Sequence, residues 1–473
     1  MVRTMAFLII KSACIVALNY TIHVENDIII LMPEFDLAIL GGGPAGYVAA
    51  LRAAQLGAKV ALIEKDKVGG TCLNRGCIPT KALITCTNFY EKIQKAQDLG
   101  IKVEKISLEV TKIFQRKKQI VERLVKGVEF LLRKNQVELI WGVGKILAPN
   151  KIEVRDQNEN RFEISSKRLI LATGSSALPL PGANFDHERF LSSDDLLEEK
   201  LLPKKLNIVG GGVIGIHFAF IFSTLGSEVT IYEIQPEILP ECDQEIVKNF
   251  KKILAAKKIK LLTSTRFDPK QTSDPTLICI GRRPNLSGLE NLPLKIENHR
   301  VWVNEKMETN LPGIYAAGDL VSNKMFAHVA FEQGIVAAEN ALGKNRIFSY
   351  EAIPYALYTS PEIAGVGYTE KQAQEKFGEI KVGKFPFAAL GIAHAQGETE
   401  GFIKVIADQN NKILGVHILG ANASELLGSA TIAIKNGLTV KQLGEVFQAH
   451  PSYPEGLQEA ALNALKKSLH IIS

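Results

Sequence analysis

The residues with the clearest capacity for chemistry are two cysteines, Cys72 and Cys77, in the glycine-containing stretch GGTCLNRGCIPTK. Four residues separate them, and a turn that enters a helix can bring cysteines at this spacing to disulfide distance. Cys77 is predicted near the helix start, where the helix dipole and the nearby Arg75 and Lys81 lower a thiol pKa and favour the thiolate. The pattern therefore indicates dithiol redox chemistry.

Zinc binding and inert burial are the alternatives for this pair. Structural zinc takes four ligands, and the chain has no second Cys or Cys/His pair at ligand spacing, so we expect no metal site. Inert burial is common for cysteine, but both thiols lie in a glycine-flanked turn beside a predicted nucleotide site. We therefore keep that interpretation only for the other four cysteines, which are Cys14, Cys86, Cys242 and Cys279.

A repeated strand–turn–helix–strand unit must position the pair. In the first copy the apolar run Phe35–Leu40 leads into GGGPAG at 41–46, and a helical pattern and a second apolar run follow, ending at Glu64. The second copy has GGGVIG at 210–215 and ends at Glu233, with the same spacing between the last glycine and the acid.

Each element of this unit suits a dinucleotide. The first glycine allows a tight turn, the second lets a phosphate approach, and the third lets the helix pack on the strand. The helix N-terminus faces the pyrophosphate, and the carboxylate binds ribose hydroxyls. One such motif is weak evidence, but two in register predict two dinucleotides, one tightly held and one exchanging. The candidate residues are Gly41, Gly43, Gly46 and Glu64 in the first copy and Gly210, Gly212, Gly215 and Glu233 in the second.

Length and composition agree with a multidomain globular protein. The 473 residues predict two to four domains, and 46% hydrophobic with 22% charged residues is typical of soluble proteins. The net charge of +6 is small and spread along the chain, so we expect no nucleic-acid partner. Six cysteines are too few for a disulfide-stapled secreted scaffold.

The first residues are unusual because Met5–Leu18 is almost entirely apolar. The run is too short to span a bilayer and no small-residue cleavage site follows it. A mitochondrial presequence would be rich in Arg and poor in acids, yet Glu25 and Asp27 are present. We therefore expect that residues 1–32 are an N-terminal extension and that translation starts at Met32. We also expect no stable membrane insertion and a cytoplasmic location.

The last third of the chain, from about Tyr350, lacks the nucleotide unit. Gly401–Ala407 and Lys412–Ile418 alternate like strands, and Ser424–Asn436 and Pro454–Ser468 have helical patterns. The sequence therefore predicts a separate α+β domain.

The cysteine stretch, extended to GGTCLNRGCIPTKAL at 69–83, resembles the signature of the flavoprotein disulfide reductases, and most closely that of the dihydrolipoamide dehydrogenases. The resemblance runs in the family's order over nearly all of residues 35–465. It continues through LATGS at 171–175, GRRPN at 281–285, IYAAGD at 314–319, YTSPE at 358–362, and His450-Pro451 with Glu455.

The resemblance implies an α/β protein with two Rossmann-like dinucleotide-binding domains, for FAD and a nested NAD, and a C-terminal α+β dimerisation domain. The FAD-binding domain would take residues 33–178 and 280–349, the shortened NAD-binding domain 179–279, and the dimerisation domain 350–473. The active form would be a homodimer.

The resemblance also implies site residues. His450 and Glu455 would form an acid–base dyad that serves the cysteines of the other subunit. Further FAD contacts would come from Lys81, Gly144, Thr173, Gly174, Asp319, Ala327 and His328, and further NAD contacts from His217 and Gly281.

The implied reaction is oxidation of dihydrolipoamide, as a lipoyl-protein dithiol, with NAD+ as acceptor. The dithiol would attack a Cys72–Cys77 disulfide after His450 removes its proton, and Glu455 would orient the imidazole. A mixed disulfide with Cys72 would form and resolve, and Cys77 would pass electrons to FAD. The implied partners are lipoyl domains of 2-oxo acid dehydrogenase or glycine cleavage complexes.

Two other functions stay open on this scaffold: another NADH-dependent disulfide or quinone reductase, and a flavin-bound assembly subunit with an impaired NAD half-reaction. Glu233 favours NAD, because a carboxylate repels a 2′-phosphate and no Arg occurs from Ile216 through Thr265. No cysteine follows Cys279, whereas mercuric reductase and one class of thioredoxin reductase usually carry a C-terminal pair.

Two departures from the family pattern concern the NAD half-reaction. His217 stands where the family usually has a Glu that pairs with the lysine matching Lys81. Two interpretations stay open: the substitution slows the NAD half-reaction or makes it pH-dependent, or the substitution is tolerated. Thr263–Thr276 is a shortened polar loop. We expect the domain still to fold, because it keeps the strands Lys258–Leu262 and Thr276–Ile280.

Overall fold

A computed structural model describes residues 22–25, 27–30, 34–198 and 202–471 of the chain. A short antiparallel hairpin, β1 (Ile22–Glu25) and β2 (Asp27–Ile30), precedes the first domain. The predicted start at Met32 lies outside the described residues. Within them, no helix joins the length and the apolar content that a bilayer crossing needs.

The first nucleotide unit forms the parallel centre of a seven-stranded sheet. Buried apolar residues fill β3, as the run Phe35–Leu40 predicts, because helices cover one face of the sheet and more strands cover the other. The last parallel strand, β18, comes from far along the chain and pairs with β8, so two segments build this sheet. The parallel strands are β3 (Phe35–Leu40), β4 (Val60–Glu64), β5 (Glu138–Trp141), β8 (Arg161–Leu171) and β18 (Ile314–Ala316). β7 (Lys151–Arg155) pairs antiparallel with β8, and β6 (Val143–Ala148) pairs antiparallel with β7.

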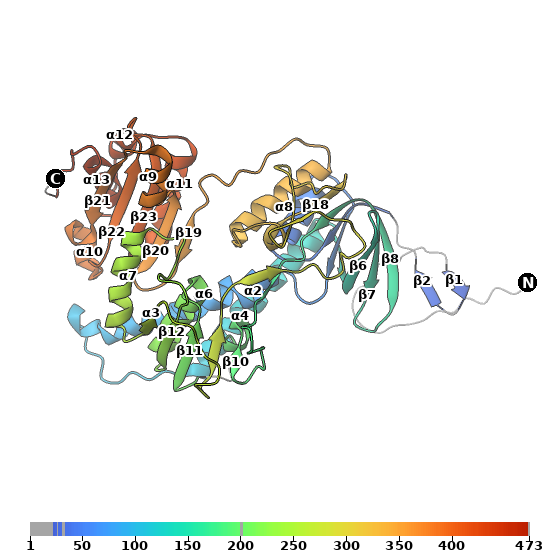
Figure 1. The fold of residues 1–473 in the computed structure, drawn as a ribbon, viewed down its shortest axis with the longest axis horizontal. Coiled ribbons are helices and arrows are strands. Elements are labelled where there is room, and N and C mark those ends of the chain that lie inside the picture. The colour runs from blue at the N-terminus through green and yellow to red at the C-terminus, as the bar shows by residue number, and fades with distance from the viewer. Residues whose placement is uncertain (1–21, 26, 31–33, 199–201, 472–473) are drawn as a thin grey trace, which may run out of the picture.

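Helices from both segments pack on this sheet. α1 and α8 lie against each other although they are far apart in sequence. Figure 1 shows α8 beside β18, the strand that precedes it in the second segment. The helices of this part are α1 (Pro44–Gln55), α2 (Gly70–Arg75), α3 (Cys77–Gln94), the 3-10 helix η1 (Ala96–Leu99), α4 (Val110–Lys134), the 3-10 helix η2 (Gly318–Leu320) and α8 (Ala327–Ala341). Short strand pairs, β9 (Ser175–Ala177) with β15 (Arg282–Pro284) and β16 (Ile296–Glu297) with β17 (Arg300–Val301), complete it.

The second nucleotide unit forms a five-stranded parallel sheet, which confirms that the shortened domain folds. Its order is β10 (Phe190–Leu191), β14 (Thr276–Ile278), β11 (Lys205–Val209), β12 (Glu228–Tyr232) and β13 (Lys260–Leu262), with α5 (Ser193–Leu196), α6 (Val213–Thr224) and α7 (Gln244–Ala256). Apolar residues surround α6, so it is buried between its own sheet and α3, which carries Cys77.

The C-terminal part is the predicted α+β unit. Its antiparallel sheet has the order β19 (Tyr355–Leu357), β20 (Glu362–Gly367), β23 (Ile413–Gly420), β22 (Phe402–Ala407) and β21 (Lys381–Pro386). Its helices are α9 (Glu370–Phe377), the 3-10 helix η3 (Phe387–Ala389), α10 (Gly391–Gln396), α11 (Ala423–Lys435), α12 (Val440–Gly444) and α13 (Pro454–Asn463). α13 ends before the predicted Ser468, because the chain turns at Lys466, which has a φ of 57°.

The two glycine turns have the same geometry. A Cβ on Gly46 would lie 1.7 Å from the carbonyl oxygen of Gly41, and one on Gly215 would lie 2.1 Å from that of Gly210. Only glycine lets each helix start this close beneath its strand. By contrast, no atom lies within 4 Å of a Cβ built on Gly212, so the outer face of that turn is open to a ligand.

A buried ion pair joins the second and third parts of the molecule. The Lys404 ammonium, 1% exposed, lies 2.8 Å from the carboxylate of Asp243, 2% exposed, and also contacts Glu370. Asp243 caps α7 by accepting the N–H of Glu245, and it accepts the first N–H of α9 from Glu370. Burial raises the pKa of Asp243, but the hydrogen bond from Lys404 and the other contacts outweigh it, and the net pKa is lowered. This contact fixes how the NAD-type sheet sits against the C-terminal sheet.

Asp243→Ala is expected to lower the free energy of unfolding by about 3–5 kcal/mol, because it leaves the buried Lys404 ammonium without its most deeply buried carboxylate partner. Urea titration followed by circular dichroism measures the loss. Lys384→Ala is the control: it removes an exposed partner of Glu245 and should cost under about 1 kcal/mol. Equal losses in the two variants would contradict a structural role for the buried pair.

Candidate active site

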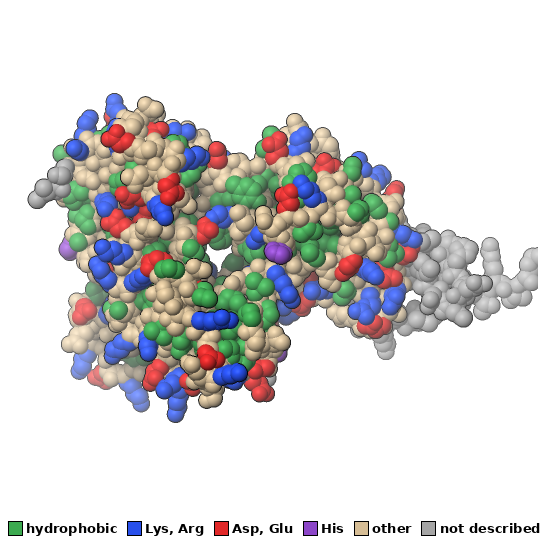
Figure 2. Space-filling view, viewed as in Figure 1, with side chains coloured by type: hydrophobic (Ala, Val, Ile, Leu, Met, Phe, Trp, Pro, Cys, Tyr) green, Lys and Arg blue, Asp and Glu red, His purple; other side chains and the backbone are tan. Residues whose placement is uncertain are grey.

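One cavity of about 2020 Å³ lies where the three parts of the chain meet, and Figure 2 shows the surface hollowed there. Both glycine turns, the cysteine pair and the start of α8 line it, and α11 closes one side. Its volume is larger than the roughly 300–1,000 Å³ of an ordinary small-molecule site, which fits two dinucleotides. The predicted residues that line it are Gly41, Gly43, Glu64, Cys72, Cys77, Lys81, Gly144, Thr173, Gly174, Gly210, Gly212, His217, Glu233, Gly281, Asp319, Ala327 and His328.

Gly46 and Gly215 lie beneath the turns instead of lining the cavity, as expected for the glycine that packs helix on strand. The two predicted acids occupy equivalent places. Glu64 Oε2 accepts the N–H of Gly42 at 2.7 Å, and Glu233 Oε2 accepts the N–H of Gly211 at 2.7 Å. Each carboxylate therefore stands at the rim of its own glycine turn, where a dinucleotide's ribose would be bound.

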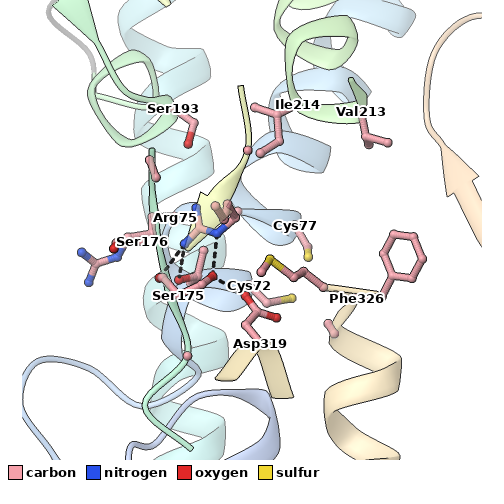
Figure 3. A pocket seen from close by; sticks show the side chains of 18 of the residues that line it. Cys72, Arg75, Cys77, Ser175, Ser176, Ser193, Val213, Ile214, Asp319 and Phe326 are labelled. Atoms are coloured by element: carbon pink, nitrogen blue, oxygen red, sulfur yellow. Dashed lines mark hydrogen bonds between the residues drawn. The ribbon is translucent and has the colours of Figure 1, made fainter. Parts of the chain in front are cut away.

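The cysteine pair spans a break between two helices. Cys72 lies in the short helix α2, where the sequence predicted only a turn, and Cys77 is the first residue of α3. Gly76 separates the helices with a φ of −144° and a ψ of −107°, which is neither helical nor extended, and a Cβ there would meet the carbonyl oxygen of Thr71 at 2.9 Å. Both cysteines are free, and Figure 3 shows their sulfurs in the part of the cavity bordered by Asp319 and Phe326.

The two thiols differ sharply in acidity. A hydrogen bond from Cys72 to Cys77 is the largest influence: it lowers the pKa of Cys77 to about 7 and raises that of Cys72 well above its ordinary value. The Lys81 ammonium lowers the pKa of Cys77 further, against the effect of burial. Cys77 is thus the thiolate of the pair near neutral pH, and Cys72 the protonated partner.

His217 is buried beside this group but does not supply a charge. Its Nε2 accepts the backbone N–H of Tyr358 at 2.9 Å, and the Tyr358 ring centroid lies 4.7 Å from Lys81 Nζ. Burial, with the nearby Lys81 ammonium, holds the pKa of His217 well below its usual range. Since the imidazole stays neutral near pH 7, it gives no reason for the NAD half-reaction to depend on pH. The predictions that remain are a slowed half-reaction or a tolerated substitution. Tyr358 belongs to the YTSPE stretch, but no sequence signal indicated its contact with Lys81.

A hydrogen-bonded group around Asp319 connects the strands that border the cysteine pair. The Ser175 hydroxyl donates to Asp319 Oδ2 at 2.5 Å, and Arg282 Nε donates to Ser175 Oγ at 2.8 Å. Arg282 also donates to the carbonyl oxygen of Ser175 at 2.7 Å and reaches the Thr71 hydroxyl at 3.5 Å. Sequence reasoning gave neither Ser175 nor Arg282 a role, because residues that orient a carboxylate carry no spacing signal.

His450 and Glu455 form a pair but do not line the cavity. The His450 Nδ1 lies 2.7 Å from Glu455 Oε1, and Glu455 Oε2 accepts the N–H of Ser452 at 2.7 Å. Burial raises the pKa of Glu455, but these hydrogen bonds outweigh it, and the net pKa is lowered. The His450 side chain is 78% exposed. Within one chain, therefore, the dyad is assembled but stands apart from Cys72 and Cys77.

Two family descriptions match the chain. The first, Pyridine nucleotide-disulphide oxidoreductase, covers residues 35–334, and the second, the dimerisation domain of the same family, covers residues 353–461. The chain is 39% identical to a dihydrolipoyl dehydrogenase of Thermus scotoductus, over 93% of this chain and 100% of the relative. It is 37% identical to the mitochondrial dihydrolipoyl dehydrogenase 1 of Arabidopsis thaliana, over 93% and 92% of the two chains.

Solved structures agree on the fold. LpdA from Mycobacterium tuberculosis superimposes with a TM-score of 0.83 at 28% identity, over 90% of this chain and 98% of that one. The flavoprotein disulfide reductase RclA from Escherichia coli, described as a Cu(II) complex, gives a TM-score of 0.81 at 26% identity, over 91% and 99%. The predicted α/β architecture, with two Rossmann-like domains and a C-terminal α+β domain, is confirmed.

Lys81→Met is expected to shift the reactivity of Cys77 to higher pH. A pKa of about 7 leaves about half of the thiol ionised at neutral pH, and loss of the ammonium raises that pKa. The rate of iodoacetamide alkylation of reduced protein, assigned to Cys77 by peptide mass spectrometry, gives the profile against pH. The exposed Lys118→Met is the control. An identical midpoint in both variants would refute the influence of Lys81.

Proposed function

Because the chain belongs to the pyridine nucleotide-disulphide oxidoreductase family, we propose that it oxidises the dithiol of dihydrolipoamide to the disulfide, with FAD as bound cofactor and NAD+ as acceptor. The observation that carries the proposal is the acidic Cys77 thiol next to Cys72, in a cavity shared by two dinucleotide-type turns. FAD and NAD supply two-electron transfer when bound, in the sites of Glu64 and Glu233 respectively.

The residues of the chain account for the thiol half of the reaction. In the oxidised enzyme the imidazole of His450 takes a proton from one substrate thiol, and the resulting thiolate attacks the sulfur of Cys72. The Cys72–Cys77 bond breaks, a mixed disulfide forms on Cys72, and Cys77 leaves as the thiolate. The second substrate thiol then loses its proton and attacks the substrate sulfur that is bonded to Cys72. The mixed disulfide breaks, lipoamide disulfide is released, and Cys72 takes up a proton and becomes a thiol again.

The unequal acidity of the two thiols supports these roles. A low pKa makes Cys77 the better leaving group, and the Lys81 ammonium stabilises the charge that it acquires. Cys72 gives the hydrogen bond that stabilises this thiolate once it has been released. The two electrons from the substrate thus rest on this pair, next to the group around Asp319.

We assign the acid–base dyad to the other subunit of a homodimer. The dimerisation domain at residues 353–461 contains His450 and Glu455, and the imidazole of His450 is 78% exposed and outside the cavity of its own chain. An exposed His–Glu pair with its carboxylate already oriented by the N–H of Ser452 suits a partner that completes its site on dimerisation. Glu455 orients the imidazole and stabilises its charged form.

The proposal extends to the protein partners and to the cellular location. Lipoyl domains of 2-oxo acid dehydrogenase or glycine cleavage complexes are the dithiol carriers that fit this chemistry, and a cytoplasmic location fits a chain with six cysteines and no secreted scaffold. The intact thiol pair and the intact dyad favour this enzyme over a flavin-bound assembly subunit. An NAD-coupled assay that compares dihydrolipoamide, lipoyl domain, glutathione and a quinone separates it from other reductases.

His450→Ala is expected to lower the rate of dihydrolipoamide oxidation by about 10²–10⁴-fold, since it removes the general base. Stopped-flow reduction of the bound flavin by NADH should persist, because that step does not need the imidazole. Glu455→Gln should lower the rate less and alter its pH profile.

A mixed dimer tests whether the dyad acts between subunits. With two affinity tags, a heterodimer of one Cys72→Ser chain and one His450→Ala chain can be purified. If the dyad acts across the interface, this heterodimer holds one complete site, and its rate should be about half of the wild-type rate. The matching homodimers are the controls. If the heterodimer is as inactive as both homodimers, the dyad does not serve the other subunit.

A further inference from the structure

Arg266 stands at the adenosine end of the second nucleotide turn, one residue beyond the stretch in which the sequence showed no arginine. It lines the cavity together with Glu233, Ile234 and Thr265. The shortened segment after β13 places it there, because only residues 263–275 connect β13 with β14.

The backbone beside Arg266 is fixed to the strand end that carries Glu233. The N–H of Thr265 donates to the carbonyl oxygen of Glu233 at 2.9 Å, and the N–H of Ser264 donates to that of Gln235 at 2.9 Å. On the other side, the Phe267 ring is buried and packs edge-on against Tyr232, with ring centroids 5.0 Å apart. Arg266 is therefore held between two anchored residues.

The charge of Arg266 is available for a ligand. Its side chain is exposed, and among the described residues no carboxylate lies within ion-pair distance of it. The neighbouring Glu233 carboxylate is engaged by two backbone donors, the N–H groups of Gly211 at 2.7 Å and Gln235 at 2.8 Å. These donors offset part of the negative charge that would otherwise repel a phosphate.

A guanidinium beside the ribose position is the group that accommodates a 2′-phosphate, through paired N–H donors that match the phosphate oxygens. We propose that Arg266 forms a 2′-phosphate subsite and that the protein accepts NADP(H) as a second coenzyme beside NAD(H). The reaction is otherwise that of the proposed function, on which this inference rests: the dithiol loses two electrons and two protons, of which the coenzyme would take up both electrons and one proton as a hydride, while the other proton goes to solvent.

Ligand binding tests the subsite without turnover. Isothermal titration of the FAD-loaded dimer with adenosine 2′,5′-bisphosphate and with adenosine 5′-monophosphate compares ligands that differ only in the 2′-phosphate. We expect the bisphosphate to bind more tightly to the wild type, and Arg266→Gln to weaken its binding about tenfold or more, since hydrogen bonds to charged groups are strong. Arg123→Gln, an exposed arginine on α4, is the matched control.

Steady-state kinetics test whether NADP(H) serves as a coenzyme. The ratio of kcat/KM for NADP+ to that for NAD+ should fall about tenfold or more in Arg266→Gln, and Arg266→Lys should recover part of it. The inference is overturned if wild-type protein does not distinguish the two adenosine ligands, or if Arg266→Gln changes binding and ratio no more than Arg123→Gln does. A wild type that oxidises dihydrolipoamide with NAD+ but fails these tests refutes the subsite alone, whereas one that lacks this activity refutes the proposed function.

Discussion

A partly buried thiolate needs partners that offset the cost of burying its charge, and the structure supplies two of them to Cys77. The Cys72 thiol donates a hydrogen bond and the Lys81 ammonium contributes its field, so the pKa of Cys77 falls to about 7 in spite of burial. Lys81 is itself constrained: burial lowers its pKa, and the two cysteines are the groups that raise it. The charges of the thiol pair and of the lysine therefore depend on one another.

The surrounding elements hold this group against the nucleotide sites. α3 starts at Cys77 and carries Lys81 one turn later, and its other face packs against α6, the helix of the second glycine turn. β18 returns to the first sheet, and Asp319 follows it at the cavity wall. The buried Lys404–Asp243 pair holds the second sheet against the C-terminal domain, which supplies α11 to the cavity and carries the exposed dyad. Each of the three parts thus contributes to one site, and in the function that we propose the other subunit of the dimer adds the base.

Much of the fold follows from the sequence, because glycine turns and buried parallel strands have strong local signals. β3 has the predicted bounds, and β4 ends at the predicted Glu64. The thiols, the two ribose-side acids and the glycines come together as expected. The exact domain boundaries and the roles of the site residues remain predictions.

Tertiary contacts account for what the sequence did not indicate. The low pKa of His217 depends on burial and on the nearby Lys81 ammonium, and the position of Arg266 depends on how a shortened segment folds back on Glu233. The orientation of Asp319 depends on Ser175 and Arg282, which come from two different segments. None of these contacts has a periodicity or a spacing that could be recognised in the sequence.

In the function that we propose, the Cys77 thiolate lies beside the bound flavin and exchanges electrons with it. Anaerobic titration of the FAD-loaded protein with dihydrolipoamide, followed by absorption spectroscopy, tests this contact. We expect a long-wavelength thiolate-to-flavin band after two electrons have entered, which Cys77→Ser abolishes and Cys86→Ser leaves intact. A wild-type protein that binds FAD but shows no such band at any pH above 7 would contradict it.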